Sequence, residues 1–146
     1  MIEVKVVDTA FRNELALLYR RMGDLTPVMQ DIGSMMESRI SDRFESHTDP
    51  TGKRWAPWAP STVDSYPEDG NHQLLDRYGD MLLSRNSQAD KNSVKIGFSQ
   101  PYATYHEYGT KHMPRRGLLF ADPDAGTLGS EDEVAVLDII ENWLTR

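Results

Sequence analysis

The 146-residue sequence predicts an α+β fold, in which a small, largely antiparallel sheet packs against a long helix and a C-terminal helix. Residues 2–7, IEVKVV, are rich in β-branched side chains, and residues 94–98, VKIGF, alternate in the period of a strand. Residues 26–45 and 130–144 instead carry apolar residues three and four apart, as amphipathic helices do. The length fits one domain, so we expect 1–146 to form a single unit.

The first part of the sequence predicts two helices. Apolar residues spaced four, three and four apart predict a helix over residues 10–22, which Gly23 would end. In the second helix, Thr26 is the expected N-cap and Pro27 the first helical residue. Its roughly 19 residues would span about 28 Å, long enough to be the spine of the domain.

Turn-forming residues and short patterns predict the rest. Residues 46–73 read as loop, with a short helix around 61–66, and helical spacing returns at 74–82. Residues 85–98 predict a β-hairpin whose turn is Asp90-Lys91-Asn92. A short helix at 102–108 would end at Gly109. At the last helix, Ser130 and Glu133 have the spacing of a capping box.

Composition excludes several classes of protein. The formal net charge of −7 argues against a dedicated nucleic-acid binder, which normally carries a basic patch. No apolar run approaches the roughly 20 residues that a membrane span needs. The first residues, MIEVKVVD, lack a basic region followed by an apolar block, so we expect the protein to act where it is made. With no cysteine, disulfides and thiolate metal sites are excluded.

The most informative segment is 49–66, DPTGKRWAPWAPSTVDSY, which places two tryptophans in a proline-rich loop. Their indoles either anchor the loop on the core, contact a protein partner, or stack on nucleic acid beside Lys53 and Arg54. We expect anchoring to apply to Trp55, because it follows the Gly52 turn. Trp58 is expected to be the more exposed of the two.

Catalytic and metal-binding motifs fail on spacing. His106 and Glu107 resemble the start of a zinc-protease helix, but the residue four after His106 is Thr110 rather than a second histidine. We expect His106 to hydrogen-bond inside the domain, and Tyr102, Tyr105 and Tyr108 to pack the short helix against the hairpin. The sequence contains no phosphate-binding loop and no nucleophile elbow. We therefore expect no enzyme activity, no metal and no cofactor.

Several segments together resemble a known family. They are DPTGKRWAPWAPST after an amphipathic stretch that ends in Phe44, LLDRYGDMLLS at 74–84, VKIGF at 94–98, YATYHEYGT at 102–110 and PRRGLLF at 114–120. In this order they are similar to the phage virion morphogenesis family, the tail-completion proteins of Mu-like and contractile-tailed phages. The resemblance is strongest over 26–121. It departs from the family pattern where Leu118, Leu119 and Phe120 run into Ala121-Asp122-Pro123.

The resemblance implies a structural protein of the virion, assembled in the host cytoplasm. It would complete the head-proximal end of the tail and support head–tail joining by binding other tail and neck proteins, and by self-association in a ring. Basic residues flank both motif segments, either as a rim for a partner or as ordinary surface charge. We take as candidate partner-binding residues Lys53, Arg54, Trp58, Arg115 and Arg116. The alternative function is a nucleic-acid-binding accessory protein.

Overall fold

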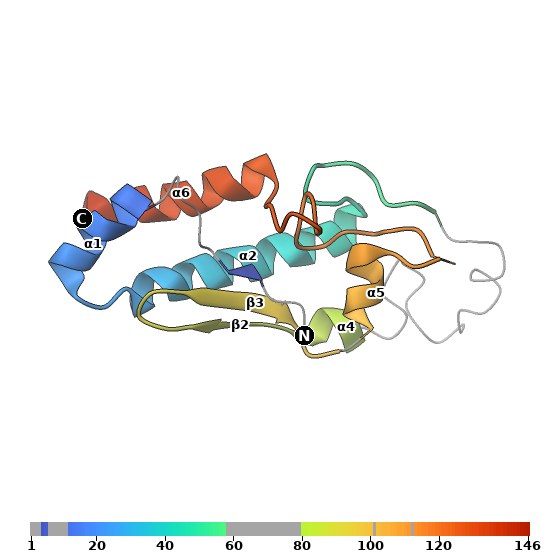
Figure 1. Ribbon diagram of the computed structural model, residues 1–146, viewed down its shortest axis with the longest axis horizontal. Coiled ribbons are helices and arrows are strands. Elements are labelled where there is room, and N and C mark those ends of the chain that lie inside the picture. Colours follow the sequence, from blue (N-terminus) through green and yellow to red (C-terminus); the bar gives the residue numbers. More distant parts are fainter. Residues whose placement is uncertain (1–3, 6–11, 58–79, 101, 112) are drawn as a thin grey trace.

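The structure is a computed structural model and describes residues 4–5, 12–57, 80–100, 102–111 and 113–146. Its elements in chain order are β1 (Val4–Lys5), α1 (Arg12–Met22), α2 (Thr26–Ser46), α4 (Asp80–Leu83), β2 (Arg85–Ala89), β3 (Val94–Phe98), α5 (Ala103–Tyr108) and α6 (Ser130–Leu144). Figure 1 shows α2 lying between the sheet and α6. The predicted α+β architecture is confirmed.

The described strands form an antiparallel sheet in the order β1-β3-β2, so that the first strand joins the outer side of the hairpin. Val4 is paired with Ile96, and Arg85 at the start of β2 is paired with Phe98 at the end of β3. The hairpin turns where it was predicted. There the Asp90 side chain accepts hydrogen bonds from two backbone N–H groups of the turn.

Helix α2 is the spine of the domain, and its 21 residues span about 30 Å. It crosses the sheet at close range. A Cβ atom added at Gly33 would lie only 2.7 Å from the hydroxyl oxygen of Ser87 on β2. The absence of a side chain at position 33 therefore allows helix and sheet to approach each other.

Helices α1 and α6 contact each other and lie on the side of α2 that faces away from the sheet (Figure 1). Helix α1 ends at Gly23, whose φ of 70° is the left-handed conformation that glycine adopts without strain. The indole nitrogen of Trp143 in α6 donates a hydrogen bond to the Asp31 carboxylate of α2 at 2.9 Å.

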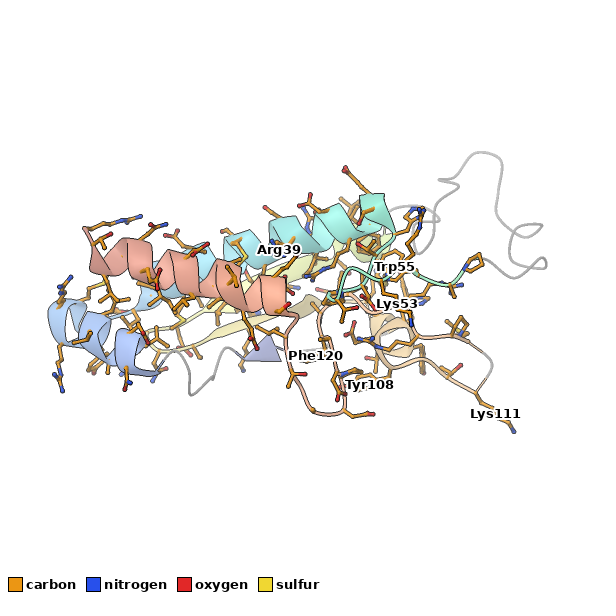
Figure 2. The ribbon with its side chains drawn as sticks, turned by 90° about the horizontal axis from the view of Figure 1, so that it is seen from above. Arg39, Lys53, Trp55, Tyr108, Lys111 and Phe120 are labelled. Atoms are coloured by element: carbon orange, nitrogen blue, oxygen red, sulfur yellow. The ribbon has the colours of Figure 1, made fainter. Side chains whose placement is uncertain are left out.

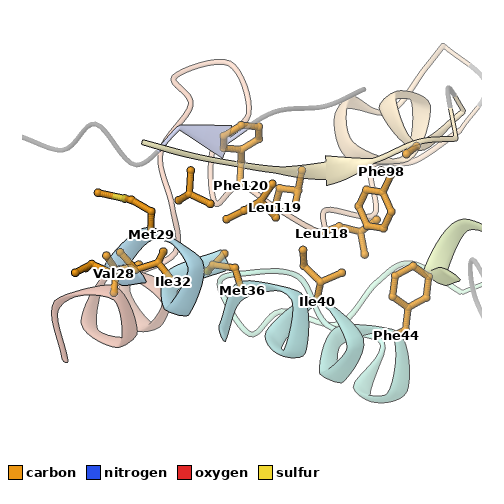
Figure 3. Packing of buried hydrophobic residues seen from close by; sticks show 14 of the residues in the cluster. Val28, Met29, Ile32, Met36, Ile40, Phe44, Phe98, Leu118, Leu119 and Phe120 are labelled. Atoms are coloured by element: carbon orange, nitrogen blue, oxygen red, sulfur yellow. The ribbon is translucent and has the colours of Figure 1, made fainter. Parts of the chain in front are cut away.

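One buried cluster joins these layers. In Figure 3, side chains of α2 face side chains of β3 and of residues 118–120. The fully buried members from these segments are Val28, Met29, Ile32, Met36, Ile40, Phe44, Val94, Ile96, Phe98, Leu118 and Leu119. Residues 118–120 belong to no helix or strand, so an irregular segment supplies part of the core.

Two helix caps differ from prediction. Thr26 is the first residue of α2 rather than its N-cap, and Asp24 accepts hydrogen bonds from the Thr26 backbone and hydroxyl groups. Helix α6 begins at Ser130 after Gly129, and the position has no side-chain cap, so the capping box is not formed. Each predicted cap misplaced the helix start by one residue, where backbone geometry rather than residue type decides.

The predictions for the middle of the chain can be compared with the structure only in part, because residues 58–79 lie outside the described residues. Of the helix expected at 74–82, the described part contains α4, and residues 61–66 lie outside the described residues. Among the helices that the structure describes, none is long and apolar enough to cross a bilayer.

Candidate functional site

The site begins with the loop at residues 47–57, which folds back on itself directly after α2. His47 has a φ of 57° and ends the helix in the left-handed conformation. The Asp49 side chain accepts hydrogen bonds from the backbone N–H groups of Thr51 and Lys53. Gly52 has a φ of 86°, which suits the turn between them. These bonds make a closed turn that leaves Lys53 and Arg54 exposed.

Trp55 anchors this loop to the core. Its indole is only 6% exposed, meets the Phe44 ring edge-on and stacks on the His47 ring. The indole nitrogen donates a hydrogen bond of 2.9 Å to the carbonyl oxygen of Gly117. The expectation that Trp55 packs inside is confirmed. Trp58 lies outside the described residues.

Arg116 fastens the end of the same loop from a second direction. Its side chain is buried, and its guanidinium donates hydrogen bonds of 2.9 Å to the carbonyl oxygens of Ala56 and Pro57. Its backbone N–H donates to the carbonyl oxygen of His106 in α5. A basic side chain therefore binds backbone groups of one loop while its own backbone binds α5.

Glu107 organises residues 115–120 from the centre of α5. The side chain is fully buried, and its two carboxylate oxygens accept hydrogen bonds from the backbone N–H groups of Leu118, Leu119 and Phe120. Arg115 donates to the Glu107 backbone carbonyl oxygen at 2.7 Å and lies 3.4 Å from its carboxylate. The carboxylate thus replaces the water that three backbone donors would otherwise need.

Arg43 and Asp132 connect this arrangement to the last helix. Both side chains are buried, and the Asp132 carboxylate forms an ion pair with Arg43 of α2. Arg43 also donates to the carbonyl oxygen of Leu118, and Arg39 donates to Asp132. A Cβ atom added at Gly129 would lie 2.2 Å from the carbonyl oxygen of Pro50, so the start of α6 packs directly on the 47–57 loop.

These contacts bring together motif segments that are separated by about sixty residues in the sequence. Comparison with known protein families identifies the family to which these segments belong. The sequence model of the phage virion morphogenesis family matches residues 6–145. The chain belongs to the phage virion morphogenesis family. The family predicted from the motif segments is therefore confirmed, over more of the chain than 26–121.

The chain is similar to the Mu-like prophage FluMu G protein 2 of Haemophilus influenzae. It is 24% identical over 147 residues, which cover 98% of this chain and 96% of that protein. No solved structure matches the chain. As a member of the virion morphogenesis family, the protein has a structural role in phage assembly and interacts with other virion proteins.

Within this family framework, the candidate partner-binding residues divide into two groups. Arg115 and Arg116 bind internal backbone groups, and Arg116 is only 8% exposed. Lys53 and Arg54 are exposed on the loop that Trp55 and Arg116 hold, and Figure 2 shows Lys53 near Trp55. Arg115 and Arg116 therefore build the site, and Lys53 and Arg54 present positive charge at its surface.

His106 is mostly buried beside this network. Burial, and then the positive charge of Arg116, lowers the pKa of His106 from 6.5 to about 4. Its ring nitrogen Nδ1 has no hydrogen-bond partner among the described residues, so the expected internal bond is not found at that atom. Among the residues that the structure describes, no three histidine or acidic side chains converge as a metal site would require.

The expectation for the tyrosines of α5 is wrong. Tyr102 is 39% exposed, Tyr105 57% and Tyr108 46%, so none of them is part of the core against the hairpin. Buried Ala103 and Glu107 form the inner face of the helix instead. A six-residue helix has fewer than two turns, so its inner face has room for few side chains. The small Ala103 and the hydrogen-bonded Glu107 occupy that face, and the tyrosine rings remain outside.

An open depression of about 250 Å³ lies between the end of α2, the 47–57 loop and the start of α6. Its lining is Arg39, Asp42, Arg43, Ser46, Thr48, Asp49, Pro50, Gly52 and Glu131. Charges of both signs line it, and two of them, Arg39 and Glu131, form an ion pair at 3.8 Å. Its composition differs from the mostly apolar lining typical of small-molecule sites.

Sequence reasoning missed the two acidic residues on which the site depends. In the sequence, Glu107 stands out only beside His106 in a metal-like motif, and Asp132 has the appearance of an ordinary surface residue. Neither has a local signal of burial, because their partners lie 11 to 13 residues and 89 residues away.

Proposed function

We propose that the protein completes the head-proximal end of the phage tail and supports the joining of tail to head. It would act by protein–protein binding, as one subunit of a ring that contacts other tail and neck proteins. Assembly would take place in the host cytoplasm, with the protein retained in the virion. Family membership supports the general role, and the rest is our proposal.

The observation that carries the proposal is the way the loop at 47–57 is held. Trp55 and Arg116 attach it to the core and to residues 115–117, while Lys53 and Arg54 remain exposed on it. A loop ordered before binding loses little conformational entropy when it meets a partner. Exposed cations on a protein with a net charge of −7 would favour an acidic patch on that partner.

Tail assembly tests this proposal directly. Phage lacking the protein should make tails that fail to join heads, and supplying the wild-type chain should restore joining. A Lys53→Glu/Arg54→Glu variant should melt near the wild-type temperature but restore few complete particles. The matched control is Arg20→Glu/Lys91→Glu, which reverses two exposed charges elsewhere and should restore joining fully. Normal joining without the protein, seen by electron microscopy, would contradict the proposal.

The alternative of nucleic-acid binding depended on aromatic rings beside Lys53 and Arg54. The Trp55 ring is occupied by Phe44 and His47, so it offers no face for a base to stack on. We propose that the protein does not act through DNA or RNA. A gel shift at physiological salt should show no saturable binding, and saturable binding would favour the alternative.

We also propose that the protein is not an enzyme and holds no metal. The spacing of His106 and Thr110 gives no second ligand on one helix face. Elemental analysis of purified protein should find no stoichiometric zinc. One zinc per chain that disappears in a His106→Ala variant would contradict this part of the proposal.

A further inference from the structure

The tyrosines of α5 form an exposed aromatic surface whose role in the fold is small. Tyr105 and Tyr108 lie three residues apart, as neighbours on one helix face do, and are 57% and 46% exposed. Exposed Lys111 follows Gly109, which ends the helix, and Figure 2 shows the Lys111 side chain projecting outward. We call Tyr105, Tyr108 and Lys111 the tyrosine end. Tyrosine is enriched at the centres of protein interfaces, and a charged residue such as lysine belongs to the polar rim around them.

A second surface, on α6, has the opposite charge. Glu131, Val134, Asp138 and Glu141 follow one another at spacings of three, four and three, which places them along one side of the helix. All four are exposed, and Val134 is 59% exposed. The sequence of α6 contains no lysine or arginine. We call these four residues the acidic stripe.

We propose that the tyrosine end of one copy docks on the acidic stripe of a second copy. The aromatic rings would cover Val134, and Lys111 would face the carboxylates of Asp138 and Glu141. The two surfaces are complementary in two ways. Each has an apolar part, and the charge beside it is positive on the tyrosine end and negative on the acidic stripe. This inference rests on the proposed function, to which it adds the surfaces through which the subunits meet.

The positions of the two surfaces decide what kind of assembly forms. Figure 1 places α5 toward one end of the long axis, whereas α6 runs from the middle of the molecule toward the other end. A contact between different surfaces of identical chains is heterologous, so each copy keeps one free surface of each kind. Repetition of such a contact produces a closed ring or an open filament. A symmetric dimer would need the same surface on both copies.

The chain offers a clean test because it contains no cysteine. We would mix a Tyr108→Cys variant with a tagged Val134→Cys variant, oxidise gently and measure the mixed disulfide. The expected result is that this disulfide forms several-fold faster than either homodimer. Tyr108→Cys mixed with Gln88→Cys, an exposed position on β2, is the matched control and should form little product. Equal rates in the two mixtures, or dominant Tyr108→Cys homodimers, would overturn the proposal.

Charge reversal gives a second readout that loss of folding cannot imitate. Adding Lys111→Glu to the first variant should slow the cross-link, and adding Asp138→Lys/Glu141→Lys to the second should slow it too. When both altered chains are mixed, opposite charges face each other again and the rate should recover. Failure to recover, with both chains folded by circular dichroism, would contradict the pairing.

The two proposals fail in different ways. If the wild-type chain restores head–tail joining but the mixed disulfide does not form, the docking contact is wrong and the proposed function stands. If the disulfide forms but the wild-type chain does not affect joining, the contact exists and the proposed function is wrong.

Discussion

The indole nitrogen of Trp55 donates a hydrogen bond to the carbonyl oxygen of Gly117, 62 residues along the chain. The bond joins the two motif segments of the family at a buried point. Arg116 repeats the connection through Ala56 and Pro57, and Glu107 holds the residues that follow Gly117. The motif residues that we describe in these segments therefore act largely on one another, and they position a few exposed side chains.

Replacement of Trp55 by Ala should lower the free energy of unfolding by roughly 3 to 5 kcal/mol, because it removes a buried aromatic ring. Trp55→Phe should cost less, about 1 to 3 kcal/mol, since a ring remains beside Phe44 while the bond to Gly117 and part of the ring volume are lost. Urea denaturation followed by circular dichroism would measure both. From the sequence we expect Trp58→Ala to cost less than Trp55→Ala, and a larger loss at Trp58 would contradict the assignment.

Glu107→Gln should destabilise the protein by about 3 kcal/mol or more, because an amide NH2 group would face backbone N–H donors that now bind a carboxylate. Glu45→Gln, at an exposed position of α2, is the matched control and should change stability by less than about 0.5 kcal/mol. Hydrogen exchange would locate the effect. Faster exchange at Leu118, Leu119 and Phe120 is expected, and unchanged protection there would contradict the role of Glu107.

Asp132→Asn should cost about 3 to 5 kcal/mol, because it leaves the buried Arg43 guanidinium without its counter-charge. Asp138→Asn, on the exposed side of the same helix, should be nearly neutral. An Arg43→Met/Asp132→Leu double variant should be more stable than the sum of its single changes implies, since no fully buried charge is left unpaired and the partly exposed Arg39 keeps Glu131 as a partner. Strict additivity in this double-mutant cycle would show that the two side chains act independently.

His106 should make the protein less stable in mild acid. Its folded-state pKa of about 4 lies below the ordinary value of 6.5, so between these values the unfolded chain binds the proton more readily. Above pH 6.5 the histidine is neutral in both states and the protein keeps its full stability. The free energy of unfolding then decreases as the pH falls from 6.5 toward about 4. Urea midpoints at pH 7 and pH 5 should therefore differ less in a His106→Gln variant than in the wild type. An equal difference in both proteins would contradict the assignment.

Local patterns in the sequence determined the main elements. The apolar spacing of α2, the alternation of β3 and the turn at Asp90 each depend on residues within a few positions of one another. The same holds for Gly23, whose conformational freedom marks the end of α1. Such features can be predicted because the physical cause lies inside the segment. The family could also be inferred from the motif segments, which are continuous stretches of sequence.

The tertiary structure alone decided which polar residues are buried. Glu107 and Asp132 look like surface residues by type, and only their distant partners, the N–H groups of residues 118–120 and the Arg43 guanidinium, make their burial favourable. The same reason explains the tyrosines of α5. Glu107 occupies the inner face of that short helix, so the rings that were expected to pack against the hairpin lie on the surface. Burial of a charge depends on what the whole chain brings to it, and no local pattern records that.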